Sequence, residues 1–155
     1  MLLVASILTS EWFIRTELPT LEPRPAATVG VKAQKVAEGC LVTVSVRITN
    51  SGKESFDASQ VNLRAWQHDP LSPRGWQKFI DVDELERPPA IIDLTLDQTR
   101  RGQLVRRYGP GEDSEQDFTW VVESTPPGTY SFHVDVEDHS KAVAQARYCQ
   151  EGLCP

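Results

Sequence analysis

The feature that most constrains the fold is a pair of alternating segments joined by a Pro-Pro-Gly turn, in the stretch FTWVVESTPPGTYSFHVDVED at residues 118–138. Large apolar residues occupy every second position on both sides of the turn. They are Phe118, Trp120, Val122, Tyr130, Phe132, Val134 and Val136. Because successive side chains of a strand point to opposite faces, the pattern predicts a β-hairpin with one face on a hydrophobic core.

Other segments with the same period predict further strands around this hairpin. In CLVTVSVRITNSG, at residues 40–52, valine or isoleucine recurs at every second position and a polar turn follows. Shorter runs are predicted as strands at 61–65, 92–96, 104–108 and 141–148, the last with Ala142, Ala144, Ala146 and Tyr148 on one face. Residues 67–90 contain four prolines and are predicted to form a long loop with a short strand at 79–82. About seven strands separated by turns predict a two-sheet β-sandwich.

Length, composition and charge restrict the class of protein. A chain of 155 residues is long enough for one domain with its own core. Eleven prolines and nine glycines favour many turns and few long helices. The formal net charge of −6 opposes a nucleic-acid role, since phosphate binding needs a concentrated positive surface.

Three cysteines bear on the compartment in which the protein works. Cys149 and Cys154 are separated by Gln-Glu-Gly-Leu, which can turn tightly, and a small disulfide loop is predicted there. Such a bond persists in oxidising compartments and would place the domain outside the cytosol. Cys40 is then expected to be a buried thiol at the start of a strand. A zinc site at Cys149 and Cys154 would lack a second ligand pair at the usual spacing.

The N-terminal segment, residues 1–18, is apolar but shorter than the roughly 20 residues that a bilayer-spanning helix needs. It lacks the positive start of a cleaved signal peptide. We expect a short membrane anchor, with an amphipathic segment docked on a partner or an edge element of the domain as alternatives. The anchor residues would be Leu2, Leu3, Val4, Ile7, Leu8, Trp12, Phe13 and Ile14.

The organisation of the rest of the chain follows from its prolines and its strand pattern. Residues 19–35 contain Pro19, Pro23 and Pro25 with few large apolar side chains, which predicts an extended spacer. The sandwich is expected over 36–149 and a short tail over 150–155.

The turns and strand ends together resemble a known family. Ile48-Thr49-Asn50-Ser51-Gly52, Tyr108-Gly109-Pro110-Gly111-Glu112, Phe118-Thr119-Trp120, Pro127-Gly128-Thr129-Tyr130 and Val134-Asp135-Val136 are followed by a short return strand at 141–148. This order resembles the bacterial and archaeal CARDB family, over residues 36–149. The resemblance implies an immunoglobulin-like domain of the kind found in cell-surface and adhesion-related proteins, without a catalytic motif. Two departures are a longer middle segment, 68–103, and a return strand that ends in Arg-Tyr-Cys.

Polar residues of the last hairpin suggest a possible ligand site. His133, Asp135 and Glu137 alternate and share one face of a strand, with Asp138 and His139 at the following turn, so a divalent metal site is conceivable. The alternative is that the core-facing residues between them simply oblige this face to be polar. Acidic residues at 81–84 lack the spacing and glycine of an EF-hand.

Partner-binding residues are expected among exposed aromatic and basic side chains. Trp66 follows the strand at 61–65 as a core anchor or an exposed contact, and Trp76 lies in the long loop. Four arginines could form a basic patch for an anionic partner or lipid headgroup, or could pair with the acids at 112–117. They are Arg100, Arg101, Arg106 and Arg107.

Motifs of hydrolases, nucleotide-binding proteins and zinc peptidases do not occur in the sequence, and no cofactor is implied. Two hypotheses of different class remain. The first is a non-catalytic, extracytoplasmic interaction domain, adhesive or an accessory subunit of a membrane-associated assembly, whose partners are other proteins. The second is a sandwich that binds a small ligand or divalent metal on the acidic face after Phe132.

Overall fold

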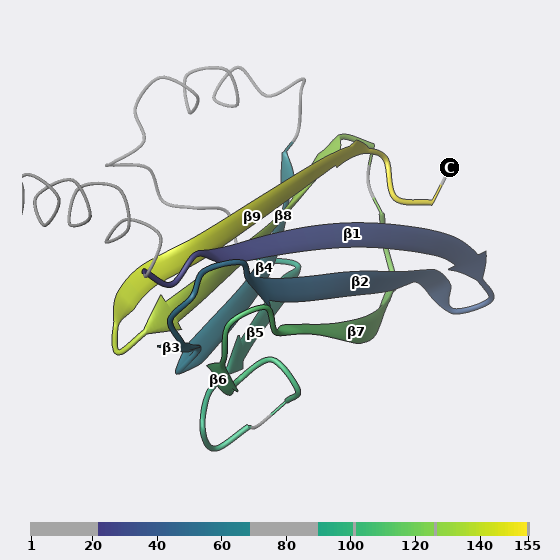
Figure 1. Cartoon of the computed structure of the whole chain (residues 1–155). Coiled ribbons are helices and arrows are strands. Elements are labelled where there is room, and N and C mark those ends of the chain that lie inside the picture. The colour runs from purple at the N-terminus through teal and green to yellow at the C-terminus, as the bar shows by residue number, and fades with distance from the viewer. Residues whose placement is uncertain (1–21, 69–89, 101, 126, 155) are drawn as a thin grey trace, which may run out of the picture.

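The computed structural model describes residues 22–68, 90–100, 102–125 and 127–154, and all regular elements in these ranges are strands (Figure 1). The strands are β1 (Pro25–Val36), β2 (Gly39–Asn50), β3 (Phe56–Asp57), β4 (Gln60–His68), β5 (Ile92–Leu96), β6 (Arg107–Tyr108), β7 (Asp113–Val122), β8 (Thr129–Asp138) and β9 (Lys141–Glu151). The predicted strand at 79–82 lies outside the described residues. Among these residues there is no helix long and apolar enough to cross a membrane.

Two antiparallel sheets form the sandwich. One has the strand order β1-β2-β7 and the other β5-β4-β8-β9, while β3 and β6 form a short two-stranded sheet. Figure 1 shows the first sheet crossing obliquely in front of β8 and β9. The predicted hairpin is divided between the sheets, because β7 pairs with β2 whereas β8 pairs with β4 and β9. The prediction of an all-β, immunoglobulin-like sandwich is confirmed.

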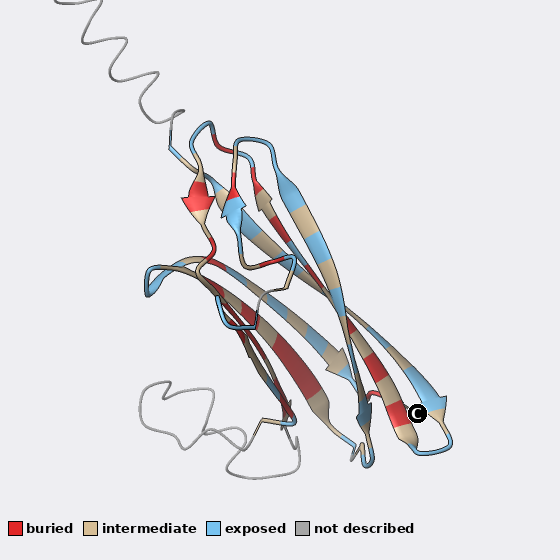
Figure 2. Ribbon diagram, turned by 90° about the horizontal axis from the view of Figure 1, so that it is seen from below, coloured by how far each residue is buried: buried red, intermediate tan, exposed pale blue. Residues whose placement is uncertain are grey.

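The hydrophobic core lies between the two sheets and follows the alternation in the sequence (Figure 2). On β2 the side chains of Val42, Val44, Val46 and Ile48 are all 0% exposed. The facing sheet contributes alternating residues of β4 and β8. These are Val61, Leu63, Ala65, Tyr130, Phe132, Val134 and Val136, each no more than 2% exposed. A period of two therefore predicted correctly which face of each of these strands is buried.

The spacer predicted at residues 19–35 is wrong from Pro25 onward. Residues Pro25–Val36 form β1, a twelve-residue strand that pairs with the whole of β2. Its core-facing residues alternate, but they are mostly small: Ala27, Val29, Val31 and Ala33. Pro25 is compatible with this strand because it is the first residue, at a sheet edge. The sandwich therefore begins eleven residues earlier than the predicted boundary at Val36.

Two smaller predictions are also wrong. The strand predicted at 104–108 is reduced to β6, Arg107–Tyr108, and Leu104 is a fully buried loop residue that accepts a hydrogen bond from the Tyr108 hydroxyl. On β9 an irregularity opposite Val136 and Glu137 turns Ala142 outward, so that it is exposed while Ala144 is buried. One extra residue in a strand shifts the face of those before it.

The polar turn after β2 is held by one buried side chain, Asn50, which is 1% exposed. Its Oδ1 accepts hydrogen bonds from the backbone N–H groups of Arg24 (3.1 Å) and Gly52 (3.0 Å). Its Nδ2 donates to the carbonyl oxygens of Glu54 (2.7 Å), Tyr108 (3.2 Å) and Gly109 (3.2 Å). One amide thus joins the start of β1, the end of β2 and the turn before β7.

Gly52 completes this turn because no larger residue fits there. A Cβ atom at Gly52 would lie 2.3 Å from the carbonyl oxygen of Glu22 and 2.4 Å from the backbone nitrogen of Arg24. Contacts this short would displace the backbone that leads into β1. Close packing of three chain segments therefore requires glycine at the end of the Asn-Ser-Gly sequence.

Trp120 faces the core as predicted, but it is only partly buried. It lies on β7, an edge strand, and stacks on Phe118 with ring centroids 6.0 Å apart. Both rings pack against the core without being enclosed by it. An edge position leaves one flank of each ring without a neighbouring strand.

We expect Trp120→Ala to lower the free energy of unfolding by about 2 kcal/mol, less than the 3–5 kcal/mol typical of a fully buried tryptophan. Urea denaturation followed by circular dichroism would measure it. Val121→Ala is the matched control, since Val121 is 49% exposed on the other face and should change stability by less than about 0.5 kcal/mol. A loss at Trp120 no greater than that at Val121 would mean that the two faces of β7 are misassigned.

Candidate functional site

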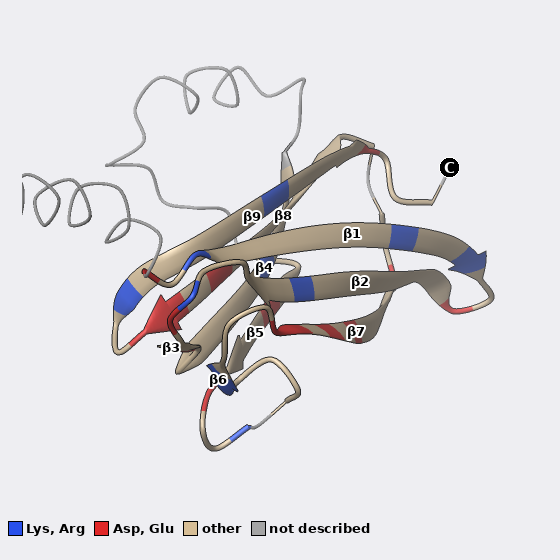
Figure 3. Ribbon diagram, viewed as in Figure 1, with Lys and Arg blue, Asp and Glu red and all other residues tan. Residues whose placement is uncertain are grey.

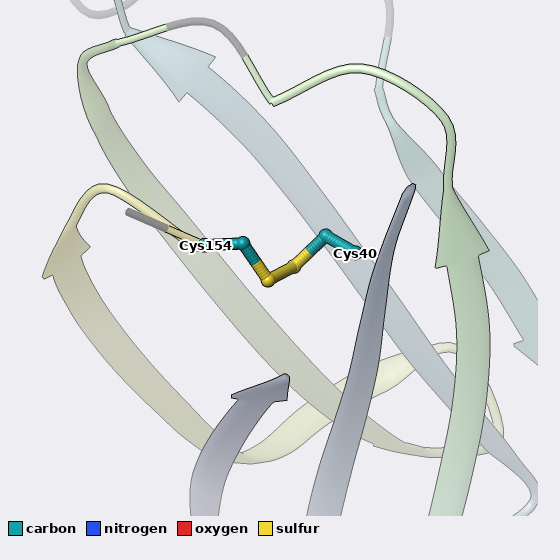
Figure 4. Close-up of a disulfide and its surroundings, with 2 residues drawn as sticks. All are labelled: Cys40 and Cys154. Carbon is teal, nitrogen blue, oxygen red and sulfur yellow. A yellow bond between two sulfur atoms is a disulfide. The ribbon is translucent and has the colours of Figure 1, made fainter. Parts of the chain in front are cut away.

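The disulfide joins Cys40 to Cys154, and the predicted Cys149–Cys154 pair is wrong (Figure 4). Cys40 is at the start of β2 and Cys154 follows β9, with a Cα–Cα distance of 5.9 Å. The residues after β9 turn at Gly152, whose φ is +67°, and Leu153 is 3% exposed. In the segment predicted as a short tail, Leu153 is therefore packed against the core and Cys154 is covalently tied to the opposite sheet.

Cys149 is a free, exposed cysteine rather than a disulfide partner. It lies on β9 opposite Ser131, and its neighbour Tyr148 is among the residues packed against the core. Strand alternation therefore directs the Cys149 side chain away from the core and from Cys40. Proximity in sequence favoured the wrong pair because the strand orientation could not be seen from the spacing.

Trp66 lies on the outer face of the β5-β4-β8-β9 sheet, since its neighbour Ala65 faces the core. Its indole meets the His133 imidazole edge-on, with ring centroids 5.0 Å apart. The side chain is nevertheless only 9% exposed. Trp66 is thus neither a core anchor nor an exposed contact, and the exposure expected of a partner-binding residue is not found. Trp76 lies outside the described residues.

Arg106 and Arg107, two of the four arginines of the predicted basic patch, bind neighbouring groups of the domain. The Arg106 guanidinium pairs with the carboxylate of Glu112 (3.4 Å) and donates to the carbonyl oxygen of Asp113 (3.2 Å). It also lies over the Tyr108 ring, with its central carbon 4.8 Å from the ring centroid. Arg107 donates to the Ser55 hydroxyl. The alternative of pairing with nearby acids is confirmed for Arg106.

The described residues include one further arginine of the predicted patch, Arg100. The backbone N–H of Arg100 donates to the Asp97 carboxylate in a local turn. A hydrogen bond from the Thr99 hydroxyl, followed by the backbone bonds from Arg100 and Thr99, lowers the pKa of Asp97. Arg101 and the predicted anchor at 1–18 lie outside the described residues.

The acidic face of β8 does not converge on a metal site in the described part of the chain. His133, Asp135 and Glu137 share the outer face, but the described residues contain no group of three or more histidines, cysteines or acids that could hold a metal ion. Glu137 accepts a hydrogen bond from Asn62 at 3.2 Å. The metal-binding alternative therefore has no support here.

The turn after β8 contains a local acid–base pair. His139 and Ser140 have φ values of 47° and 70°, which suits the tight turn between β8 and β9. The imidazole of His139 contacts the carboxylate of Asp138, and this hydrogen bond raises the pKa of His139. Elsewhere, burial raises the pKa of the Tyr108 and Tyr130 hydroxyls.

β7 is an edge strand of its sheet and has an acidic outer face, whereas the sequence analysis treated this segment as half of a hairpin. Acidic residues alternate with core-facing residues along it, and Figure 3 shows the acidic bands. Asp113 pairs with Arg47, and Asp117 accepts a hydrogen bond from Ser45 at 2.6 Å. Glu115 lies between them without an ion pair to a described residue. The signal available in the sequence was the acid at every second position, which we had interpreted as neutralising the arginines.

No protein-family model matches the chain. No curated protein matches it either. Among solved structures, it is similar to the CARDB domain of a Pyrococcus furiosus protein, at 12% identity and a TM-score of 0.46, covering 83% of this chain and 94% of that one. A crystal structure of the same domain in complex with di-metal ions gives 13% identity, a TM-score of 0.44 and coverages of 84% and 94%. The Bacillus subtilis sporulation control protein gives 16% identity, a TM-score of 0.47 and coverages of 83% and 49%. These likenesses concern the fold, and CARDB is the family that the sequence motifs resemble.

Proposed function

We propose that this protein is a non-catalytic, extracytoplasmic interaction domain that serves as an adhesive module or accessory subunit of a membrane-associated assembly. The observation that carries the proposal is the Cys40–Cys154 disulfide, which links residues 114 apart in the sequence. Disulfides of this kind form and persist in oxidising compartments such as the periplasm or the cell exterior. The bond thus supports a location outside the cytosol.

The use of the polar residues also supports an interaction role. Arg47, Arg64 and Arg106 form ion pairs with acids on neighbouring strands or turns. These side chains stabilise the sandwich surface instead of converging on a substrate. Function in such a domain depends on surfaces that other proteins can recognise.

Residues 1–18 are proposed to attach the domain to a membrane or to a membrane-embedded partner. Their apolar character is the basis for this, together with the fact that the sandwich pattern is complete from Pro25. The apolar segment would provide attachment by burial in the bilayer interface or in a partner.

We expect deletion of residues 2–18 to move the protein from the membrane fraction to the soluble fraction with almost no change in melting temperature. The reason is that this deletion leaves β1 and its pairing with β2 intact. Fractionation of host cells and thermal melts of the purified proteins would measure both effects. Deletion of residues 2–36 is the control, because loss of β1 exposes β2 and should destabilise the sandwich strongly. A parent protein that fractionates as soluble would refute the attachment.

Isolation of the full-length protein from host membranes in mild detergent tests the interaction role directly. We expect a partner protein to co-purify in fixed stoichiometry, identified by mass spectrometry. A protein that is monomeric in detergent and brings no partner under several extraction conditions would contradict the proposal.

A further inference from the structure

Among the described strands, β7 has a hydrogen-bonded neighbour on one side and none on the other. It pairs with β2 along its length, and it ends its sheet, since the order is β1-β2-β7. Its ten residues make it a long edge strand. Long edge strands are unusual unless they are protected, because their free N–H and C=O groups can pair with another chain.

The pairing pattern identifies the backbone groups that face outward. Asn50 of β2 is hydrogen-bonded toward β7, through its N–H to Glu112 (2.9 Å) and its carbonyl to the N–H of Gly111 (2.8 Å). In an antiparallel sheet the N–H and C=O of one residue point the same way and those of the next residue the opposite way. The backbone groups of even-numbered β2 residues therefore bond to β7. Their register partners on β7, which include Phe118, Trp120 and Val122, direct their own backbone groups toward β2.

The odd-numbered residues of β7 consequently direct their backbone groups away from β2. The first half of this edge is partly covered. Arg106 donates to the carbonyl oxygen of Asp113 (3.2 Å), and the backbone of Gln103 bonds to the side chains of Ser114 (3.0 Å) and Gln116 (2.9 Å). Beyond it, no described residue forms a backbone–backbone hydrogen bond to the outer side of Asp117, Thr119 or Val121. The open part of the edge is therefore 117–122, which we call the β7 edge.

The two faces beside the β7 edge differ in chemistry. On the core side, the stacked rings of Phe118 and Trp120 and the side chain of Val122 are only partly buried, so an added apolar side chain could cover them further. On the outer side are Glu115 and Asp117, both acidic and next to the open backbone. An incoming strand would meet apolar surface on one face and negative charge on the other.

Charge determines which strand can occupy this site. A second copy pairing antiparallel through β7 about Thr119 would bring Glu115 opposite Glu123 of the other copy, and like charges directly opposite each other destabilise a sheet. The same acids would attract lysine or arginine on an incoming strand. They therefore discourage self-association while allowing a basic partner.

We propose that the β7 edge is a strand-addition site for an extended segment of another protein in which apolar residues alternate with lysine or arginine. The apolar residues cover Phe118 and Trp120, the basic residues pair with Glu115 and Asp117, and the backbone of Asp117, Thr119 and Val121 supplies the hydrogen bonds. This inference rests on the proposed function, for which it names one binding surface and the class of partner.

The test uses the full-length protein in non-ionic detergent and a fluorescent peptide of about ten residues in which valine alternates with lysine. We expect anisotropy to report saturable binding that weakens as salt increases, and hydrogen–deuterium exchange to slow at 117–121. The control peptide, with valine alternating with glutamate, should bind at least about tenfold more weakly. Equal affinity for both peptides, or no binding of the lysine peptide, would overturn the proposal.

Two variants locate the binding on the β7 edge. Thr119→Pro removes an outward N–H and obstructs strand addition without removing a backbone hydrogen bond to β2. It loses only the exposed 3.4 Å contact between the Thr119 and Thr43 hydroxyls, which Thr119→Val loses as well. Peptide affinity should therefore fall at least about tenfold while the melting temperature changes little. Thr119→Val retains the N–H and should bind like the parent. If Thr119→Pro fails to fold, the double variant Glu115→Lys with Asp117→Lys serves instead, and should prefer the glutamate peptide. Unchanged preference, or a dimer that depends on β7, would refute the site.

The same variants separate this inference from the proposed function. A co-purifying partner that is lost with Thr119→Pro supports both. A partner that remains bound to Thr119→Pro in fixed stoichiometry would leave the interaction role intact and overturn the β7 edge as its surface.

Discussion

Replacement of both Cys40 and Cys154 by alanine is expected to lower the free energy of unfolding by about 4–5 kcal/mol. The bond closes a loop across a sequence separation of 114, and in the chain-entropy model the stabilisation grows with loop length. Cleavage would also release the segment that holds Leu153 in the core. Urea denaturation with and without a reducing agent would measure the effect, because reduction of the parent should reproduce most of the loss.

Cys149→Ser provides the matched control for this prediction. The exposed Cys149 thiol has no part in the bond, so the variant should keep the disulfide and change stability by less than about 0.5 kcal/mol. A Cys149–Cys154 bond would behave differently, because a loop so short is worth only about 2 kcal/mol and Cys149→Ser would abolish it. Peptide mapping without reduction should link the peptides that contain Cys40 and Cys154. A link between Cys149 and Cys154 would contradict the structure.

Asn50→Ala is expected to cost about 3 kcal/mol or more. The substitution removes one buried amide and leaves two N–H groups and three carbonyl oxygens of the turn without this partner. Each buried polar group that loses its partner costs about 1–3 kcal/mol, partly offset where water enters. Thermal and urea denaturation would measure the loss.

Two further variants distinguish the stability contributed by the buried Asn50 amide from that contributed by the rest of the turn. Ser51→Ala alters the neighbouring exposed residue, whose hydroxyl makes a 3.4 Å contact with the Arg24 carbonyl, and should change stability by less than about 0.5 kcal/mol. Asn50→Asp retains the acceptor for Arg24 and Gly52 but places a carboxylate oxygen against three carbonyl oxygens, so it should also be destabilising. Wild-type stability of Asn50→Asp would mean that the Nδ2 bonds contribute little.

Much of the sandwich follows from local patterns. The alternation at 40–50 and 129–138 predicted the buried faces of β2 and β8, since the period of side chains along a strand depends on the backbone alone. The Asn-Ser-Gly turn predicted the end of β2, because turn residues also act through local backbone conformation. β1 was not predicted as a strand, because Ala27 and Ala33 give a weak apolar signal and because the prolines before it are typical of a linker.

The candidate sites depended on information that no local pattern contains. Spacing suggested Cys149 as the partner of Cys154, whereas the structure brings the start of β2 to the end of β9 and turns Cys149 outward. The sequence suggested that Trp66 could be an exposed partner contact, but its indole packs on the outer face of the sheet against His133. The acids of β7 became a candidate surface only when the sheet order left that strand at an edge. The sequence by itself determined which faces of most strands are buried, because alternation is local. Only the tertiary structure decided which cysteines pair and which strands lie at the edges of their sheets, because both depend on how distant strands are ordered in space.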